Sequence, residues 1–294
     1  MPKTEHRLDS LASIPLRKAV RKTMARVRAC QHYTGLARYY DEFFTFHRPW
    51  YETARQRLLG KILRRGRSAC DLACGTGATA LALAGRGMRV IAVDLSPMMC
   101  RLARQKALSA RLPIRVVRAD MRSFRLPEAV DLVLCEFDAI NHVRRKDDLA
   151  RVAKAAARAL RPGGYFYFDV NNRMAFQQIW PGTWWLERPG VVLVLHGGYD
   201  SHRDKGWTNA EWFLRDGGCW RRFHERIEQV CWAPSEIRRA LRRAGFDRIR
   251  SCDATPFFRG DSRIRPGCRT FYVAQKANSE TRRHLSRTQG DRWR

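Results

Sequence analysis

The sequence lacks the long apolar runs of a membrane protein and the paired cysteines of a zinc site. No stretch approaches the ~18 consecutive apolar residues that span a bilayer, and no apolar signal core follows the basic start. The nine cysteines include no C-x-x-C pair, so the sequence indicates no metal centre. We therefore expect a soluble protein of the reducing cytoplasm.

Acidic residues are also scarce. The chain has 57 Lys and Arg against 28 Asp and Glu, a net charge of +29, yet its hydrophobic fraction of 45% and its nine Trp indicate a folded protein. Residues 1–30 carry a net +6 and are expected to form a basic N-terminal extension, whereas residues 278–294 carry +3 and are expected to be a disordered basic tail. The folded body keeps most of the charge, which favours acidic partners.

From residue 68 onward, short apolar runs alternate with longer helical patterns, which is typical of parallel β-α-β units. The first expected strand ends at Leu72, and the next four cover residues 89–96, 114–120, 130–138 and 164–171. Tryptophan-rich runs with period-two alternation then predict an antiparallel insertion at about residues 179–232, before a helix and two strands return to the α/β pattern. We expect one α/β domain over residues 31–277, with helices on both faces of its main sheet.

One strand-to-helix turn carries a ligand-binding signature. The stretch CDLACGTGATALALAGRG starts at residue 70 and places Gly75 and Gly77 in the turn, where the missing Cβ lets the backbone approach a ligand closely. Within it, GTGATA also satisfies the dinucleotide pattern G-x-G-x-x-G/A. A nicotinamide or flavin site therefore stays open on this turn alone.

Three carboxylates discriminate between the two kinds of nucleotide ligand. Asp71, Asp94 and Asp120 fall at the carboxyl ends of successive predicted strands, the edge at which open α/β sheets bind ligands. Asp94 could accept hydrogen bonds from ribose hydroxyls in either case, but Asp71 would repel a pyrophosphate and suits an ammonium or sulfonium group. Asp71 could alternatively cap a helix, and Asp94 and Asp120 could form turns, although a coincidence at all three strand ends argues for a ligand.

These residues resemble the Rossmann-like (class I) S-adenosylmethionine-dependent methyltransferases, and in particular the small-molecule subgroup related to methyltransferase domain 25. The resemblance covers roughly residues 35–276 and includes Arg161-Pro162-Gly163-Gly164 before the fifth strand. It implies a seven-stranded sheet with helices on both faces, a small antiparallel β insertion after strand five that caps the substrate, and S-adenosyl-L-methionine as cofactor. Ala73 stands where the fuller family pattern has a first glycine.

By this resemblance, five segments form the cofactor site. The implied cofactor-binding residues are Asp71, Ala73, Cys74, Gly75, Thr76, Gly77, Asp94, Leu95, Ser96, Asp120, Met121, Arg122, Cys135, Glu136 and Phe137. Asp94 is expected on the ribose, Asp120 on the adenine amino group and Met121 on the adenine ring.

The acceptor is expected to be a small molecule, methylated on nitrogen or oxygen by in-line displacement. Methyltransferases of amino groups on bases usually carry (Asp/Asn)-Pro-Pro-(Tyr/Phe) after strand four, whereas this chain has Cys135-Glu136-Phe137-Asp138. Resemblance to small-metabolite enzymes implies catalytic roles for His142 and Tyr40, and an N-terminal segment around Tyr39-Tyr40-Asp41 that covers the cofactor. The expected acceptor-lining residues are Tyr33, Trp50, Trp212, Arg222 and His224.

Other interpretations of the same residues stay open. His142 could be a capping or packing residue, and most of the Trp residues could simply pack the insertion. The charge of the body allows a methyltransferase of RNA or of an RNA-associated protein, or a nucleic-acid-binding module that has lost its cofactor. On the small-molecule reading, the basic surface still predicts non-specific binding of nucleic acid.

Overall fold

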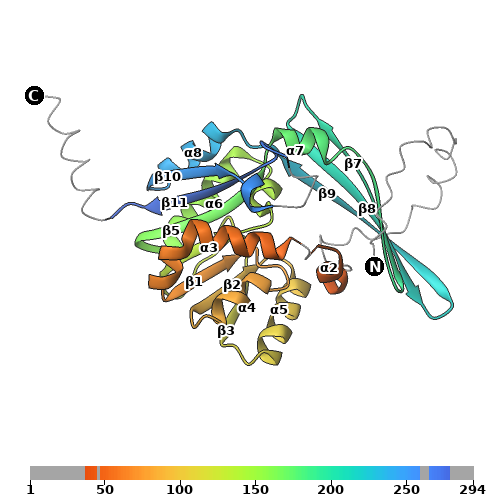
Figure 1. Cartoon of the computed structure of the whole chain (residues 1–294), viewed down its shortest axis with the longest axis horizontal. Coiled ribbons are helices and arrows are strands. Elements are labelled where there is room, and N and C mark those ends of the chain that lie inside the picture. The colour runs from red at the N-terminus through yellow and green to blue at the C-terminus, as the bar shows by residue number, and fades with distance from the viewer. Residues whose placement is uncertain (1–36, 45–46, 259–264, 279–294) are drawn as a thin grey trace, which may run out of the picture.

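The computed structural model describes residues 37–44, 47–258 and 265–278 (Figure 1). The predictions for residues 1–30, for Tyr33 and for the tail beyond residue 278 lie outside this part of the chain. The helices are α2 (Ala37–Phe44), α3 (Arg48–Arg65), α4 (Ala78–Ala84), α5 (Pro97–Ser109), α6 (Lys146–Ala159), α7 (Arg173–Gln178) and α8 (Pro234–Arg243), with 3-10 helices η1 (Ala139–His142) and η2 (Thr255–Phe257). The strands are β1 (Ser68–Leu72), β2 (Arg89–Asp94), β3 (Ile114–Arg118), β4 (Val130–Cys135), β5 (Leu160–Asn171), β6 (Gly182–Arg188), β7 (Val191–Asp200), β8 (Lys205–Asp216), β9 (Cys219–Val230), β10 (Phe246–Asp253) and β11 (Arg269–Lys276).

Seven strands form the main sheet, in the order β10-β11-β5-β4-β1-β2-β3. The pairs from β5 to β3 are parallel, while β11 runs antiparallel to both of its neighbours. All five residues of β1 are buried, as expected for a central strand covered on both faces. The carboxyl ends of β1, β2, β3 and β4 consequently meet at one edge of the sheet.

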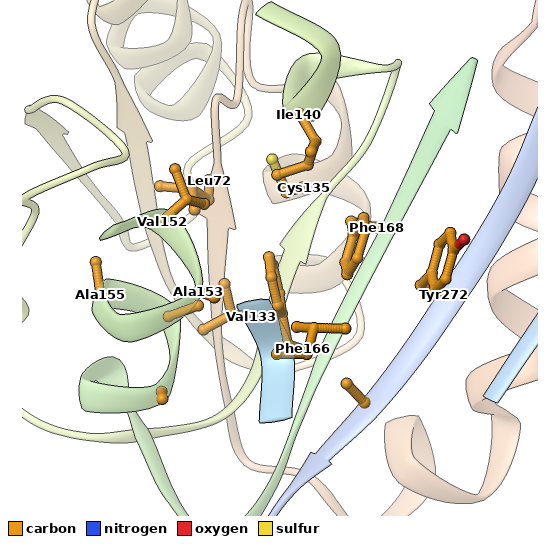
Figure 2. Packing of buried hydrophobic residues seen from close by; sticks show 14 of the residues in the cluster. Leu72, Val133, Cys135, Ile140, Val152, Ala153, Ala155, Phe166, Phe168 and Tyr272 are labelled. Carbon is orange, nitrogen blue, oxygen red and sulfur yellow. The ribbon is translucent and has the colours of Figure 1, made fainter. Parts of the chain in front are cut away.

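Helices cover both faces of this sheet. On one face α6 and α8 enclose the larger apolar core, and Figure 2 shows Val152 and Ala153 of α6 packed near Val133 of β4 and Phe166 of β5. On the other face α3 and α4 pack on the same strands, with Tyr51 contributing from α3. Because successive side chains of a strand point to opposite faces of the sheet, each strand contributes residues to both cores.

Strand β5 begins earlier than the sequence indicates, at Leu160 instead of Gly164. Val130 pairs with Leu160, but Leu132 pairs with Tyr165, so the Arg-Pro-Gly-Gly segment bulges out of the ladder. Gly163 adopts φ 76° within it. The stop signal after α6 therefore lies inside an irregular strand.

The insertion after β5 is an antiparallel sheet in the order β6-β7-β8-β9. Figure 1 shows its long strands extending away from the main sheet. Its inner face packs on α2, where Phe43 meets Trp212 edge-to-face at a centroid distance of 5.6 Å. The predicted fold class, a seven-stranded α/β sheet with an antiparallel insertion after strand five, is confirmed. Within the described ranges, no helix is long and apolar enough to cross a membrane.

Candidate active site

The glycine turn between β1 and α4 is held in left-handed conformations. Ala73, Gly75 and Gly77 have φ values of 57°, 53° and 85°. A Cβ on Gly77 would lie 3.0 Å from Ala103 of α5, so this position also needs glycine for close packing. Ala73 stands where the family pattern has glycine. It adopts a left-handed conformation although it carries a Cβ, so its backbone is strained.

Asp71 lies buried beneath this turn, at 2% exposure. Its Oδ2 accepts a hydrogen bond of 2.9 Å from the backbone N–H of Ala80, so it anchors the first turn of α4. Burial raises its pKa to about 8, and the Glu136 carboxylate adds to the effect while Arg55 opposes it. The helix-capping alternative therefore describes a real contact, in a carboxyl group that also lies close to the ligand edge.

Asp94, at the end of β2, organises the other side of the turn. Its two oxygens accept hydrogen bonds of 2.8 Å from the N–H groups of Gly75 and Ser96. Burial raises its pKa, and these N–H groups act in the opposite direction. A carboxylate offers about four acceptor positions, so Asp94 keeps acceptor capacity for a ribose hydroxyl.

Asp120, after β3, is bound by its own neighbour. The Arg122 guanidinium folds onto the carboxylate through Nε and Nη2, the latter at 2.6 Å, and the Arg122 backbone N–H donates at 2.8 Å. These hydrogen bonds hold the pKa of Asp120 below its usual value. An adenine amino group would share this carboxylate with Arg122.

Glu136, after β4, pairs with a helix on the far side of the turn. Its Oε2 accepts from Arg55 of α3 at 2.5 Å and from the Thr79 hydroxyl at 2.8 Å. The next residues, Phe137 and Asp138, have φ values of 59° and 49°, which is uncommon outside glycine. This strained turn stacks the Phe137 ring on Tyr51 at a centroid distance of 4.1 Å.

A cavity of about 710 Å³ lies along this edge of the sheet. Of the predicted cofactor residues, those that line it are Ala73, Gly75, Asp94, Leu95, Ser96, Asp120, Met121, Arg122, Glu136 and Phe137. Those that do not are Asp71, Cys74, Thr76, Gly77 and Cys135, which support the turn or lie in the core. Sequence reasoning missed Arg118, the last residue of β3, and Arg144 and Arg145, which precede α6; all three line the cavity.

Helix α2 is tied across the glycine turn by Asp41. Its Oδ1 accepts from the Thr76 hydroxyl at 2.7 Å and from Arg48 at 2.6 Å, and its Oδ2 accepts from Lys106 of α5. Burial alone would raise the pKa of Asp41, but these contacts hold it below the usual range. Thr76 thus fixes α2 in place, and Tyr40 of the same helix lines the cavity.

A second cavity, of about 230 Å³, adjoins the first. Tyr40, Phe137 and His142 line both of them. Its remaining wall combines aromatic rings with polar groups from the insertion and the main sheet: Phe44, His47, Tyr51, Asp138, Trp180, Leu195, Thr208, Ala210, Trp212, Glu225, Ile227, Gln229, Phe258 and Arg269. Its position makes it the candidate acceptor site.

Arg269 of β11 joins two carboxylates at this second cavity. Nη1 donates to Asp169 at 2.5 Å and to the Tyr51 hydroxyl, and Nη2 donates to Asp138 at 2.7 Å. Burial raises the pKa of Asp169 to about 6, against the attraction of Arg269. Glu225 is a further carboxylate in the lining of this cavity.

The predicted acceptor residues divide into two groups. Trp212 lines the second cavity, whereas Trp50 packs on Phe258 at a centroid distance of 5.4 Å and does not line it. Arg222 and His224 bind Glu211 on the opposite face of the insertion sheet, because β9 presents alternate residues to the two faces. The sequence pattern of tryptophans and basic residues does not reveal the strand register. The register decides which face of the sheet each side chain occupies.

Comparison with known proteins agrees with this geometry. Residues 69–164 match a family model described as a methyltransferase domain. The chain is 30% identical over 188 residues to the cypemycin N-terminal methyltransferase of a Streptomyces species, a match that covers 62% of this chain and 73% of that protein. The chain belongs to the class I S-adenosylmethionine-dependent methyltransferases. S-adenosylmethionine is accordingly the implied methyl donor.

Two further matches extend over most of this chain. The YqeM protein of Bacillus subtilis is 28% identical over 249 residues, which cover 84% of this chain and 98% of that protein. The sugar N-methyltransferase KedS8 from a Streptoalloteichus species has a TM-score of 0.68 at 22% identity and covers 86% of this chain and 96% of that one. At this identity the second match shows a shared fold.

Proposed function

We propose that this methyltransferase transfers the methyl group of S-adenosylmethionine to the nitrogen of a small-molecule amine. The observation that carries the proposal is the junction of two cavities at Tyr40, Phe137 and His142. The larger cavity takes the cofactor and the smaller one takes the acceptor. The reacting nitrogen and methyl carbon then meet at the junction, screened from water by α2.

In the cofactor cavity, Asp94 accepts hydrogen bonds from the ribose hydroxyls and Met121 packs against the adenine ring. Asp120 accepts from the adenine amino group while it keeps its bonds to Arg122. Their positions at the ends of β2 and β3 support these roles. Asp71 supports the turn from below.

The chemistry of the smaller cavity favours an amine over an alcohol. Aromatic faces, among them Tyr51, Phe258 and Trp212, attract cations through their ring quadrupoles. The carboxylates of Asp138 and Glu225 line the same wall, and Asp169 lies behind them. Carboxylates beside aromatic rings attract a cation, and this lining suits an ammonium. The name of KedS8, a sugar N-methyltransferase, also specifies methylation on nitrogen.

The reaction itself needs little covalent participation by the protein. The acceptor ammonium first gives a proton to a lining carboxylate or to solvent. The lone pair of the neutral amine then forms the N–C bond as the S–C bond breaks, which leaves an N-methylammonium and a neutral thioether. Holding the two centres close and excluding water supplies most of the acceleration. Burial and the nearby carboxylates Asp138 and Asp94 raise the pKa of Tyr40, so its hydroxyl stays protonated and acts as a hydrogen-bond donor.

The test is a labelling experiment with methyl-labelled S-adenosylmethionine and a cell extract that is separated into small molecules, protein and RNA. We expect label in the small-molecule fraction, on nitrogen, and its loss with Asp94→Ala. Label in one defined RNA position would overturn the proposal. Binding of RNA alone would not, because non-specific phosphate contacts of the basic surface should weaken by about 10³-fold between 50 and 200 mM salt.

A further inference from the structure

We propose that Gln229, at the end of β9, is a positioning residue that holds His142 neutral, with the ring proton on Nδ1. The consequence for catalysis rests on the proposed function, whereas the tautomer follows from hydrogen-bond geometry alone. Sequence patterns single out His142 but give no reason to connect it with a glutamine 87 residues away.

The side-chain amide of Gln229 sits among three polar groups. It is buried, at 3% exposure. Its Nε2 lies 2.6 Å from Asp138 Oδ2 and 3.1 Å from His142 Nε2, while its Oε1 accepts from Asn171 Nδ2 at 3.4 Å. The amide is therefore surrounded on both of its ends.

Asp138 decides which way this amide points. Its other oxygen accepts from the Arg269 guanidinium at 2.7 Å, so the carboxylate is already engaged as an acceptor. A reversed amide would place the Gln229 oxygen 2.6 Å from a carboxylate oxygen, with no proton between them. The amide nitrogen must face Asp138, and its second hydrogen is then directed at His142.

The same hydrogen fixes the proton of the imidazole ring. His142 Nε2 can receive it only with a lone pair, because an N–H there would oppose the N–H of Gln229. An imidazolium is disfavoured for the same reason. The ring is left with its proton on Nδ1.

This arrangement limits what His142 can do at the junction of the cavities. Its basic lone pair is already used by Gln229, so the proton of an acceptor ammonium goes elsewhere, and the carboxylates of Asp138 and Glu225 line the same cavity. What Gln229 fixes is the plane of the His142 ring and the position of its proton. Gln229 thereby links the insertion sheet to the edge where the methyl group is transferred.

The experiment is a long-range ¹H–¹⁵N spectrum of the full chain with ¹⁵N-labelled histidine, recorded at mildly alkaline pH with and without S-adenosylhomocysteine. His142 is identified by the signal that disappears in His142→Asn. We expect the Nδ1–H form to exceed the Nε2–H form by roughly tenfold or more. Gln229→Met removes the donor at Nε2 and should leave a mixture of the two forms.

Gln275→Met is the matched control, since Gln275 donates to the Gly163 carbonyl at another part of the sheet, and it should leave the His142 signal unchanged. An Nε2–H signal in the natural protein, or an unchanged preference for the Nδ1–H form in folded Gln229→Met, would overturn the inference. If Gln229→Met does not fold, the spectrum of the natural protein still decides. A protein that shows the Nδ1–H form but binds no S-adenosylhomocysteine would refute the proposed function and leave this inference standing.

With an acceptor in hand, Gln229→Met should lower kcat roughly 10- to 100-fold with little change in the KM for S-adenosylmethionine, because a displaced ring misplaces the acceptor and not the cofactor. A rise in the KM for S-adenosylmethionine as large as the fall in kcat would contradict a positioning role.

Discussion

The two cavities of this protein are built in different ways. Most of the cofactor cavity is lined by short segments at the carboxyl ends of β1, β2, β3 and β4, and Tyr40, Arg144 and Arg145 are among the residues that complete its wall. The acceptor cavity takes its lining from α2, α3, η1, three strands of the insertion and β11. The first depends on local backbone geometry at strand ends, and the second depends on how distant segments pack together.

This difference predicts that damage to one cavity should leave the other in working order. The cofactor edge should depend on a few carboxylates and on strained turns. The acceptor cavity should depend on a buried charge network that spans the chain from Tyr51 to Arg269. The following changes separate the two, from the largest expected effect to the smallest.

Arg269→Met should cause the largest loss, about 3–5 kcal/mol in the free energy of unfolding, because it leaves Asp138 and Asp169 buried without their cation. Urea denaturation measures it. Arg173→Met is the matched control: its pair with Asp204 is exposed and should contribute under about 1 kcal/mol. Folded Arg269→Met should still bind S-adenosylhomocysteine normally, and a parallel loss of that affinity would show that the two cavities are not independent.

The cofactor edge could be predicted from the sequence because its signals are local. A carboxylate at a strand end and glycines in a turn act within a few residues of each other, as Asp94 and Gly75 do. Asp71 was found by the same signal, although it contacts α4 and does not line the cavity.

The acceptor cavity could not be predicted in this way. The register of β9 decides whether a side chain reaches the cavity: Arg222 faces solvent, whereas Glu225 lines the cavity. Arg269 and Gln229 carry no motif at all, and only the tertiary fold brings them to Asp138. The aromatic clue did identify Trp212, but the same clue selected Trp50, which packs outside the cavity.

Asp71→Asn tests the electrostatic cost at the cofactor edge. The folded pKa of Asp71 is about 8 against an ordinary value of 3.8, so between these pH values the folded state keeps a proton that the unfolded state has lost. The stability contribution of Asp71 is therefore fully present below its ordinary pKa of 3.8 and is lost as pH rises from there to about 8. Denaturation of both proteins without cofactor, at several pH values, should show the natural protein losing stability relative to Asp71→Asn. A constant difference would contradict the raised pKa.

Asp94→Ala should weaken binding of S-adenosylhomocysteine about tenfold or more, since charged hydrogen bonds to the ribose contribute about 1.5–3 kcal/mol. Calorimetry gives the affinity directly. Glu225→Gln, a change in the acceptor cavity, should leave this affinity unchanged. Unchanged binding in Asp94→Ala would remove Asp94 from the cofactor site.

Ala73→Gly should have the smallest effect and the most distinctive sign. Ala73 has φ 57°, a conformation that costs a residue with a Cβ about 1 kcal/mol and glycine almost nothing. The substitution should therefore stabilise the protein by about 0.5–1 kcal/mol, even though glycine enlarges the entropy of the unfolded chain. Ala82→Gly, at an exposed position in α4, is the matched control and should destabilise by about 1 kcal/mol. Thermal unfolding of the two variants should shift in opposite directions. A destabilised Ala73→Gly would mean that the Ala73 methyl group makes contacts in the turn that outweigh the strain, and the cofactor edge would then depend on side-chain packing as the acceptor cavity does.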